Sequence, residues 1–261
     1  MEFITLPLAG FLIGLLIISL GGGGGGIYVG ILTAFFNVSP AVAAATSLAT
    51  IIPTTIIGTL SHWKAGNVNP YLGRIMLLGA VIGALVGSSC SDLLPISLYN
   101  KLTGLLLLAL GVQMLLSERN SRRKPSHANQ PNNSLTAPHD KRSIAKAIAY
   151  GFLGGMMSGI VGISGTAPIV AGLAVLGCRP LEIVGTSVFV LVGISITGFL
   201  VHLGLGNIHW TFVGLLVSGT MIGAFLGPVL LKRIKRAVLE RVLPPILIIL
   251  TLAMGAIDFL K

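Results

Sequence analysis

Six consecutive glycines interrupt an apolar stretch near the start of the chain. They occupy residues 21–26, within "FLIGLLIISLGGGGGGIYVGILTAFF". Each glycine costs a helix about 1 kcal/mol relative to alanine, so a run of six is expected to break a helix. The flanking residues are nevertheless typical of the interior of a bilayer. We therefore expect a backbone break inside a membrane segment.

Composition supports this setting. Of the 261 residues, 54% are hydrophobic and 9% are charged, whereas soluble domains carry roughly 25% charged residues. A membrane-spanning helix needs about 20 mostly apolar residues. Six such stretches predict spans, and two further segments are interrupted. The spans are 41–61, 70–90, 95–116, 181–203, 208–231 and 239–260, and the interrupted segments are 6–36 and 145–177. The sequence predicts an all-α polytopic protein, with multiple passes through the cytoplasmic (inner) membrane.

The net charge of +10 is concentrated in two places. Residues 117–146 hold seven Lys and Arg residues, and residues 232–241, "KRIKRAVLER", hold five more. Basic loops of a membrane protein usually face the cytoplasm. No aromatic residues alternate with these charges, so nucleic acid is not an expected partner.

The two halves of the chain resemble each other. "GAVIGALVG" at Gly79 matches "GTMIGAFLG" at Gly219, and "PAVAAATS" at Pro40 matches "PLEIVGTS" at Pro180. We therefore predict a first repeat over residues 1–116, a polar cytoplasmic linker over 117–143 and a second repeat over 144–261. Each repeat has four segments and opens with a glycine-broken helix.

The loops indicate how the repeats are oriented. The basic loop 232–241 corresponds to residues 91–101 of the first repeat, "SDLLPISLYNK", which carry little charge. Equivalent loops of different charge favour opposite sides of the membrane, and hence inverted repeats. Each broken segment would then be re-entrant and add no net crossing. The alternative is one kinked full crossing per half, with parallel repeats, and it leaves the basic loop 232–241 outside.

The broken segments are the first candidates for a binding site. Irregular backbone at membrane depth is tolerated where it lines a cavity or is buried in protein, and free amides at helix N-termini attract anions. The alternative is that the glycines serve only close helix packing, which we expect for Gly79, Gly83 and Gly87. The candidate site residues at the breaks are Gly23, Gly24 and Gly25 in the first half and Ser164, Gly165 and Thr166 in the second.

Polar side chains repeated in both halves are the second group of candidates. Thr46 and Ser47 recur as Thr186 and Ser187, and the four hydroxyls are expected to face one central cavity with the two breaks. The structural alternative is that each hydroxyl donates a hydrogen bond to a backbone carbonyl of its own helix. His62 recurs as His202, and both could take part in proton coupling or simply cap the ends of their helices.

Other chemistry is not expected. No acidic residue lies clearly within a span, and Asp258 falls in the last turns of the final segment, which favours an anion path over a cation pump. The chain has no HExxH or GxSxG motif and no nucleotide-binding motif, so neither an enzyme nor an ATP-driven pump is expected. Cys90 and Cys178 lack metal-binding spacing, and no metal or cofactor is expected.

The chain resembles the sulfite exporter TauE/SafE family. The resemblance rests on "GGGGGGIYVGILTAFFNVSPAVAAATSLATIIPTTIIGTLSHWKAGNVN" and on a degenerate copy from Gly151 to Val229. The second break lacks the full glycine run, so the halves are expected to contribute unequally to the site. The resemblance implies transport of a small sulfur oxyanion or organosulfonate.

Two functions from one scaffold remain open at this point. The first is a secondary transporter for a small sulfur-containing anion such as sulfite, thiosulfate, sulfate or an organosulfonate, and the second is an anion-selective channel. Lipid and a small anion are the expected partners. The sequence leaves open the substrate, the direction of transport, the coupling ion and whether the chain forms a homo-oligomer.

Overall fold

The structure is a computed structural model that describes residues 2–20, 24–91, 93–123, 140–204, 208–233, 248–249 and 251–260. Helices make up nearly all of this part of the chain, which contains no strand. The helices are α1 (Glu2–Leu20), α2 (Gly25–Gly30), the π-helical η1 (Ile31–Phe35), α3 (Pro40–Lys64), α4 (Pro70–Ser91), α5 (Ile96–Arg123), α6 (Lys141–Val161), α7 (Thr166–Val175), α8 (Pro180–Gly204) and α9 (Trp210–Arg233). A further helix, Thr251–Leu260, is called the C-terminal helix below.

The all-helical prediction is confirmed for the described part of the chain, and four helices there are long and apolar enough to cross a membrane. They are Pro40–Lys64, Pro70–Ser91, Lys141–Val161 and Leu181–Gly204. Three of them coincide with the predicted spans 41–61, 70–90 and 181–203. The predicted spans 95–116 and 208–231 coincide with parts of α5 and α9, apart from residues 95, 208 and 209, which precede these helices. Much of the predicted span 239–260 lies outside the described residues. Large apolar side chains face outward, including Leu78 and Ile249, as expected for contact with lipid.

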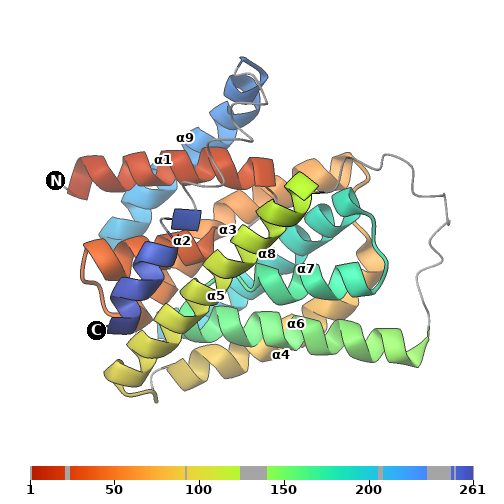
Figure 1. Cartoon of the computed structure of the whole chain (residues 1–261), viewed down its shortest axis with the longest axis horizontal. Helices are drawn as coiled ribbons and strands as arrows, with labels where there is room; N and C mark the ends of the chain where they lie inside the picture. Colours follow the sequence, from red (N-terminus) through yellow and green to blue (C-terminus); the bar gives the residue numbers. More distant parts are fainter. Residues whose placement is uncertain are drawn as a thin grey trace.

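Glycines bring α4 and α6 into direct backbone contact. Gly151 and Gly155 of α6 lie against the carbonyl groups of Met76 and Ala80 of α4. Both sets advance by four residues in the same direction, so the two helices run parallel, side by side at the bottom of Figure 1. Gly79 of α4 lies in turn against the carbonyl of Ile148. Small residues allow this close approach of helices, which confirms the packing role expected for Gly79.

Helices α1 and α9 repeat the same contact. Gly10 and Gly14 of α1 lie against the carbonyl groups of Leu216 and Thr220 of α9. The α1 glycines precede Gly151 and Gly155 by 141 residues, and the α9 positions follow Met76 and Ala80 by 140. Each half of the chain therefore packs its first helix on a later helix of the other half, and both pairs run parallel.

The equivalent helices α3 and α8 pack against each other in opposite directions. A Cβ atom built at Gly58 would lie 3.1 Å from Val188 Cγ1, and one at Gly198 would lie 2.7 Å from Leu48 Cδ1. Contacts near the end of one helix thus meet the beginning of the other. Helices α3 and α8 correspond in sequence and are therefore antiparallel in space. In Figure 1 the pair α4 and α6 lies at the bottom of the molecule, and α1 lies near the top.

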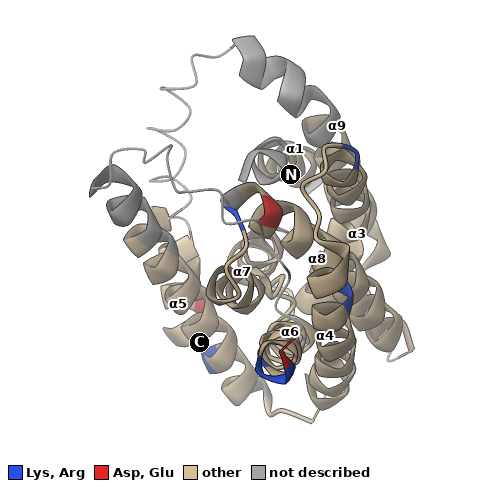
Figure 2. Ribbon diagram, turned by 90° about the vertical axis from the view of Figure 1, so that its right-hand side faces the viewer, with Lys and Arg blue, Asp and Glu red and all other residues tan. Residues whose placement is uncertain are grey.

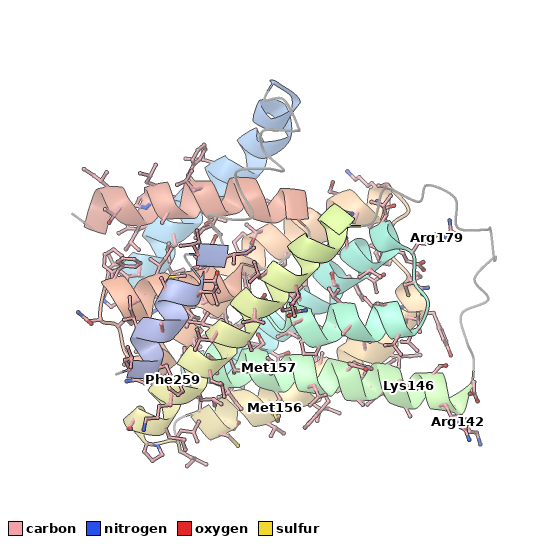
Figure 3. The ribbon with its side chains drawn as sticks, in the orientation of Figure 1. Arg142, Lys146, Met156, Met157, Arg179 and Phe259 are labelled. Carbon is pink, nitrogen blue, oxygen red and sulfur yellow. The ribbon has the colours of Figure 1, made fainter. Side chains whose placement is uncertain are left out.

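Charged residues lie mostly at helix ends. Figure 2, seen from the end of the molecule where α6 begins, shows few charged positions on the ribbon. Figure 3 places Arg142 and Lys146, in the first turns of α6, at the same end as Arg179, which precedes α8. The predicted linker 117–143 begins within α5 and ends within α6, and residues 124–139 lie outside the described part.

Candidate functional site

The second break is a turn between two helices that run in opposite directions. Helix α6 ends at Val161, and Gly162 (φ 72°) donates its amide to the carbonyl of Ser158 at 2.7 Å. Gly165 (φ 56°) then precedes α7. Both glycines are left-handed, a conformation that glycine adopts without a steric penalty. Helix α7 returns along α6, because Gly165 lies against Gly154 and Gly172 lies against Tyr150.

The first break is described from Gly24 onward, and Gly23 lies outside the described residues. Gly24 is left-handed at φ 64°, so an α-helix does not continue through it. Its carbonyl accepts the amides of Ile27 and Tyr28 at 3.0 and 3.2 Å, which starts α2 at Gly25. The six-glycine run therefore contains a break, as predicted, and a helix begins inside the run.

The two breaks touch each other. A Cβ atom built at Gly25 would lie 2.6 Å from the carbonyl oxygen of Gly162 and 2.8 Å from the amide nitrogen of Ser164. These neighbours are backbone atoms, which cannot rotate away as a side chain can. Only glycine at position 25 allows this approach, and the contact joins the two halves of the chain at their broken segments.

Ser47 connects both breaks. Its hydroxyl lies 3.1 Å from the carbonyl oxygen of Gly25 and 3.2 Å from that of Gly162, so it can donate to either. Ser47 is fully buried on α3, and so is the neighbouring Thr46, whose hydroxyl has no hydrogen-bond partner among the described residues. On the other side of the turn, the Ser164 and Thr166 hydroxyls lie 2.7 Å apart. Six predicted site residues are thus found at or beside the touching breaks: Gly24, Gly25, Ser47, Ser164, Gly165 and Thr166.

Thr186 and Ser187 lie elsewhere. Thr186 accepts the backbone amide of Asn69 at 2.9 Å, at the start of α4, and Ser187 donates to the carbonyl of Val184 in its own helix at 2.9 Å. Val188, the next residue on α8, faces Gly58 of α3. Gly58 is twelve residues from Thr46, or ~18 Å along a helix axis. The structure therefore does not bring the four hydroxyls together.

The two histidines also differ. His202 is fully buried, and its Nε2 lies 3.2 Å from the carbonyl oxygen of Gly159, in the last turn of α6 before the second break. His62 is half-buried in the last turn of α3. Only His202 is close to a break.

Two serines that are not among the predicted site residues lie in the same region. Ser88 and Ser158 are fully buried, and neither hydroxyl has a hydrogen-bond partner among the described residues. A Cβ atom at Gly159 would lie 3.0 Å from Ser88 Oγ, so Ser88 is close to the end of α6. Their signal in the sequence is weak, because serine is common among the small residues of packed membrane helices.

Asp258 lies in the last turn of the C-terminal helix, where the sequence predicts it, and it is only 2% exposed. Its carboxylate accepts a hydrogen bond from Thr33 at 2.5 Å. Among the described residues, no three His, Cys, Asp or Glu side chains are grouped so that they could hold a metal ion.

Comparison with known proteins gives one family. Residues 6–254 match the model of the family described as "Sulfite exporter TauE/SafE". The chain is 27% identical over 232 residues to the probable membrane transporter protein YdhB of Bacillus subtilis, covering 88% of this chain and 91% of YdhB. It is 26% identical over 266 residues to the probable membrane transporter protein YunE of the same organism, covering 96% of each. No solved structure matches the chain significantly.

Proposed function

The chain belongs to the sulfite exporter TauE/SafE family of membrane transporters, and from that premise we propose that it is a secondary transporter for a small sulfur-containing anion. The contact between the two breaks carries this proposal. Gly25 approaches Gly162 and Ser164 so closely that the breaks touch, and Ser47 reaches a carbonyl of each. A site shared by two broken helices is a recurring arrangement in secondary transporters.

The proposed binding groups are backbone amides and hydroxyls. Helices α2 and α7 begin at the two breaks, so the positive ends of their dipoles lie at the contact. Free amides and hydroxyls would give an oxyanion several hydrogen-bond donors without a fixed charge. The proposed site comprises Gly23, Gly24, Gly25, Thr46, Ser47, Ser164, Gly165 and Thr166, with His202 beside it. Thr186 and Ser187 would line the path toward the start of α4.

We propose further that the repeats are inverted and that each broken segment is re-entrant. The antiparallel packing of α3 on α8 and the return of α7 along α6 support this arrangement. The linker and the loop 232–241 would then be cytoplasmic. Cysteines placed at Ser126 and Lys235 should resist an impermeant reagent in intact cells, and one near Lys261 should react. A cytoplasmic C-terminus would contradict the inverted arrangement.

Direct contact between the breaks favours a carrier over a channel. In the structure described here, no side chain or gap separates Gly25 from Gly162. An anion would have to part the two breaks to pass, which suits alternating access better than a continuous pore.

Transport by purified protein tests the function. Proteoliposomes should take up at least one of labelled sulfite, sulfate, thiosulfate or a sulfonate, with and without a pH gradient. The matched control is Gly214→Ala, because a Cβ atom at Gly214 meets no atom within 4 Å. Uptake equal to that of empty liposomes for all four anions would reject a sulfur anion as the substrate.

A further inference from the structure

The C-terminal helix packs against the helix that leaves the first break. A Cβ atom at Gly30 of α2 would lie 2.7 Å from Met254 Sδ, and Thr33 of η1 contacts Asp258 four residues further along. On its other side the C-terminal helix meets α5, where a Cβ atom at Gly104 would lie 2.8 Å from the carbonyl oxygen of Gly255. Figure 3 marks this helix by Phe259, at its end.

This contact buries a carboxylate. Asp258 is 2% exposed and Thr33 is 3% exposed. The Thr33 hydroxyl lies 2.5 Å from Asp258 Oδ2 and 2.9 Å from the carbonyl oxygen of Val29. Ionisable groups inside membrane proteins are costly and mark ion or proton paths more often than packing positions.

Thr33 has one hydroxyl proton, and at least three acceptor oxygens lie within its reach: Asp258 Oδ2 and the carbonyl oxygens of Val29 and Gly30, the last at 3.3 Å. When Asp258 is ionised, the hydroxyl donates to the carboxylate. When Asp258 is protonated, the acid can donate to Thr33, and the hydroxyl can turn to Val29 at 2.9 Å. The protonation of Asp258 thus sets which partner Thr33 binds. Thr33 lies in a π-helical turn, a feature that is frequent at functional sites.

Few titratable groups lie near Asp258 on the described residues of α5, α2 and η1. On α5 they are Lys101, which is exposed, and Tyr99, which donates to the carbonyl of Ile160. On α2 the one such group is Tyr28, paired with Thr220 at 2.8 Å. Residues 24–35 carry no charged side chain, nor do residues 251–257.

We propose that Asp258 carries the proton that is coupled to anion movement, and that Thr33 transmits its protonation state to the first break. This proposal rests on the proposed transport function. Asp258 takes one proton from one aqueous phase and releases it to the other, and only its O–H bond forms and breaks. The connection to the site is short, because η1 continues α2, which begins at Gly25 in contact with the second break.

The test compares Asp258→Asn with the wild type in proteoliposomes that contain a pH-sensitive dye. Asparagine keeps a hydrogen-bond acceptor for Thr33 but does not titrate. We expect wild-type anion flux to be accompanied by proton flux. In Asp258→Asn the proton flux should fall to the level of empty liposomes, while exchange of labelled for unlabelled anion continues. Asp140→Asn, at an exposed aspartate before α6, is the matched control and should keep both fluxes.

The outcomes separate a coupling role from a structural one. If Asp258 only fixes the helix, Asp258→Asn should keep wild-type proton flux, and that result overturns the proposal. Should Asp258→Asn not accumulate, Asp258→Glu, which retains a carboxyl, should accumulate and keep proton flux. The proposal is also overturned if Asp258→Glu folds and exchanges anion but shows no proton flux.

Infrared spectroscopy provides a readout that does not depend on the substrate. The wild type should show a carboxylic-acid band that changes with pH and is missing from Asp258→Asn. If no labelled anion moves but this band titrates, the proposed substrate class fails and the titrating role of Asp258 stands. If anion moves but the band is the same in the variant, the role of Asp258 fails and the transport function stands.

Discussion

Ser47 and Ser187 occupy equivalent positions in the two halves of the chain, yet they have different partners. Ser47 joins the broken segments of both halves, while Ser187 bonds to a carbonyl of its own helix. The equivalent histidines also have different surroundings, since His202 lies beside a break and His62 is half-buried at a helix end. Residue types repeated in sequence therefore do not have repeated roles.

The packing glycines behave differently. Gly10 and Gly151 make the same contact with carbonyl groups of Leu216 and Met76. Close helix packing depends on backbone shape, which the repeat preserves. A hydrogen bond depends on a single partner, which either half can lose. The scaffold is thus close to symmetric, and the polar site is not.

The largest effect is expected at the contact between the breaks. Gly25→Ala would place a methyl group against backbone atoms of Gly162 and Ser164, and overpacking of this kind costs about 1–3 kcal/mol. Uptake in proteoliposomes should be lost, whereas Gly214→Ala should transport normally. Normal uptake by Gly25→Ala would show that the breaks need not touch during transport.

The symmetric scaffold predicts equal losses in the two halves. Gly79→Ala and Gly219→Ala each place a methyl group against a carbonyl, of Ile148 and Pro7 respectively. Both should lower the free energy of unfolding by about 1–3 kcal/mol, measured by thermal unfolding in detergent. A loss at only one of the two glycines would show that the paired helices are not equivalent.

Alanine substitutions at the equivalent serines Ser47 and Ser187 should have different effects in the two halves. Ser47→Ala leaves two buried carbonyls without this donor, at a cost of about 1–3 kcal/mol, and should reduce uptake. Ser187→Ala removes a bond within one helix and should cost about 0.5 kcal/mol, the low end for a hydrogen bond. If Ser47→Ala and Ser187→Ala reduce uptake equally, Ser47 has only a structural role.

The smallest effect concerns the thiols. Burial, with a smaller contribution from Glu182, raises the pKa of Cys178 to about 12. Because the thiolate is the reactive form, Cys178 should react slowly with iodoacetamide at neutral pH and faster as the pH rises, measured in a Cys90→Ser variant because Cys90 is an exposed thiol. Removing the negative charge with Glu182→Gln should lower this pKa and speed the reaction slightly. Rapid reaction at neutral pH would contradict the buried environment.

Much of the fold could be predicted from the sequence because it depends on properties that each segment carries. Apolar length predicts α3, α4 and α8, and glycine predicts the breaks at Gly24 and Gly165. The partners of individual side chains could not be predicted, because they depend on helices far apart in the chain. The repeat suggested that Thr186 would join Thr46, but antiparallel packing of α3 and α8 separates them. The position of Asp258 near a helix end could be predicted, but its burial could not, because burial depends on the packing of the C-terminal helix against η1 and α5.

The exchange of first helices between the halves has a consequence for biosynthesis. Helix α9, on which α1 packs, is made about 200 residues after α1. At roughly 5–20 residues per second, α1 waits on the order of 10–40 s for its partner. During that time its glycine face is open to lipid or to other nascent helices. Neither half of the chain completes its packing alone, so the paired helices can assemble only after segments of both halves have been made.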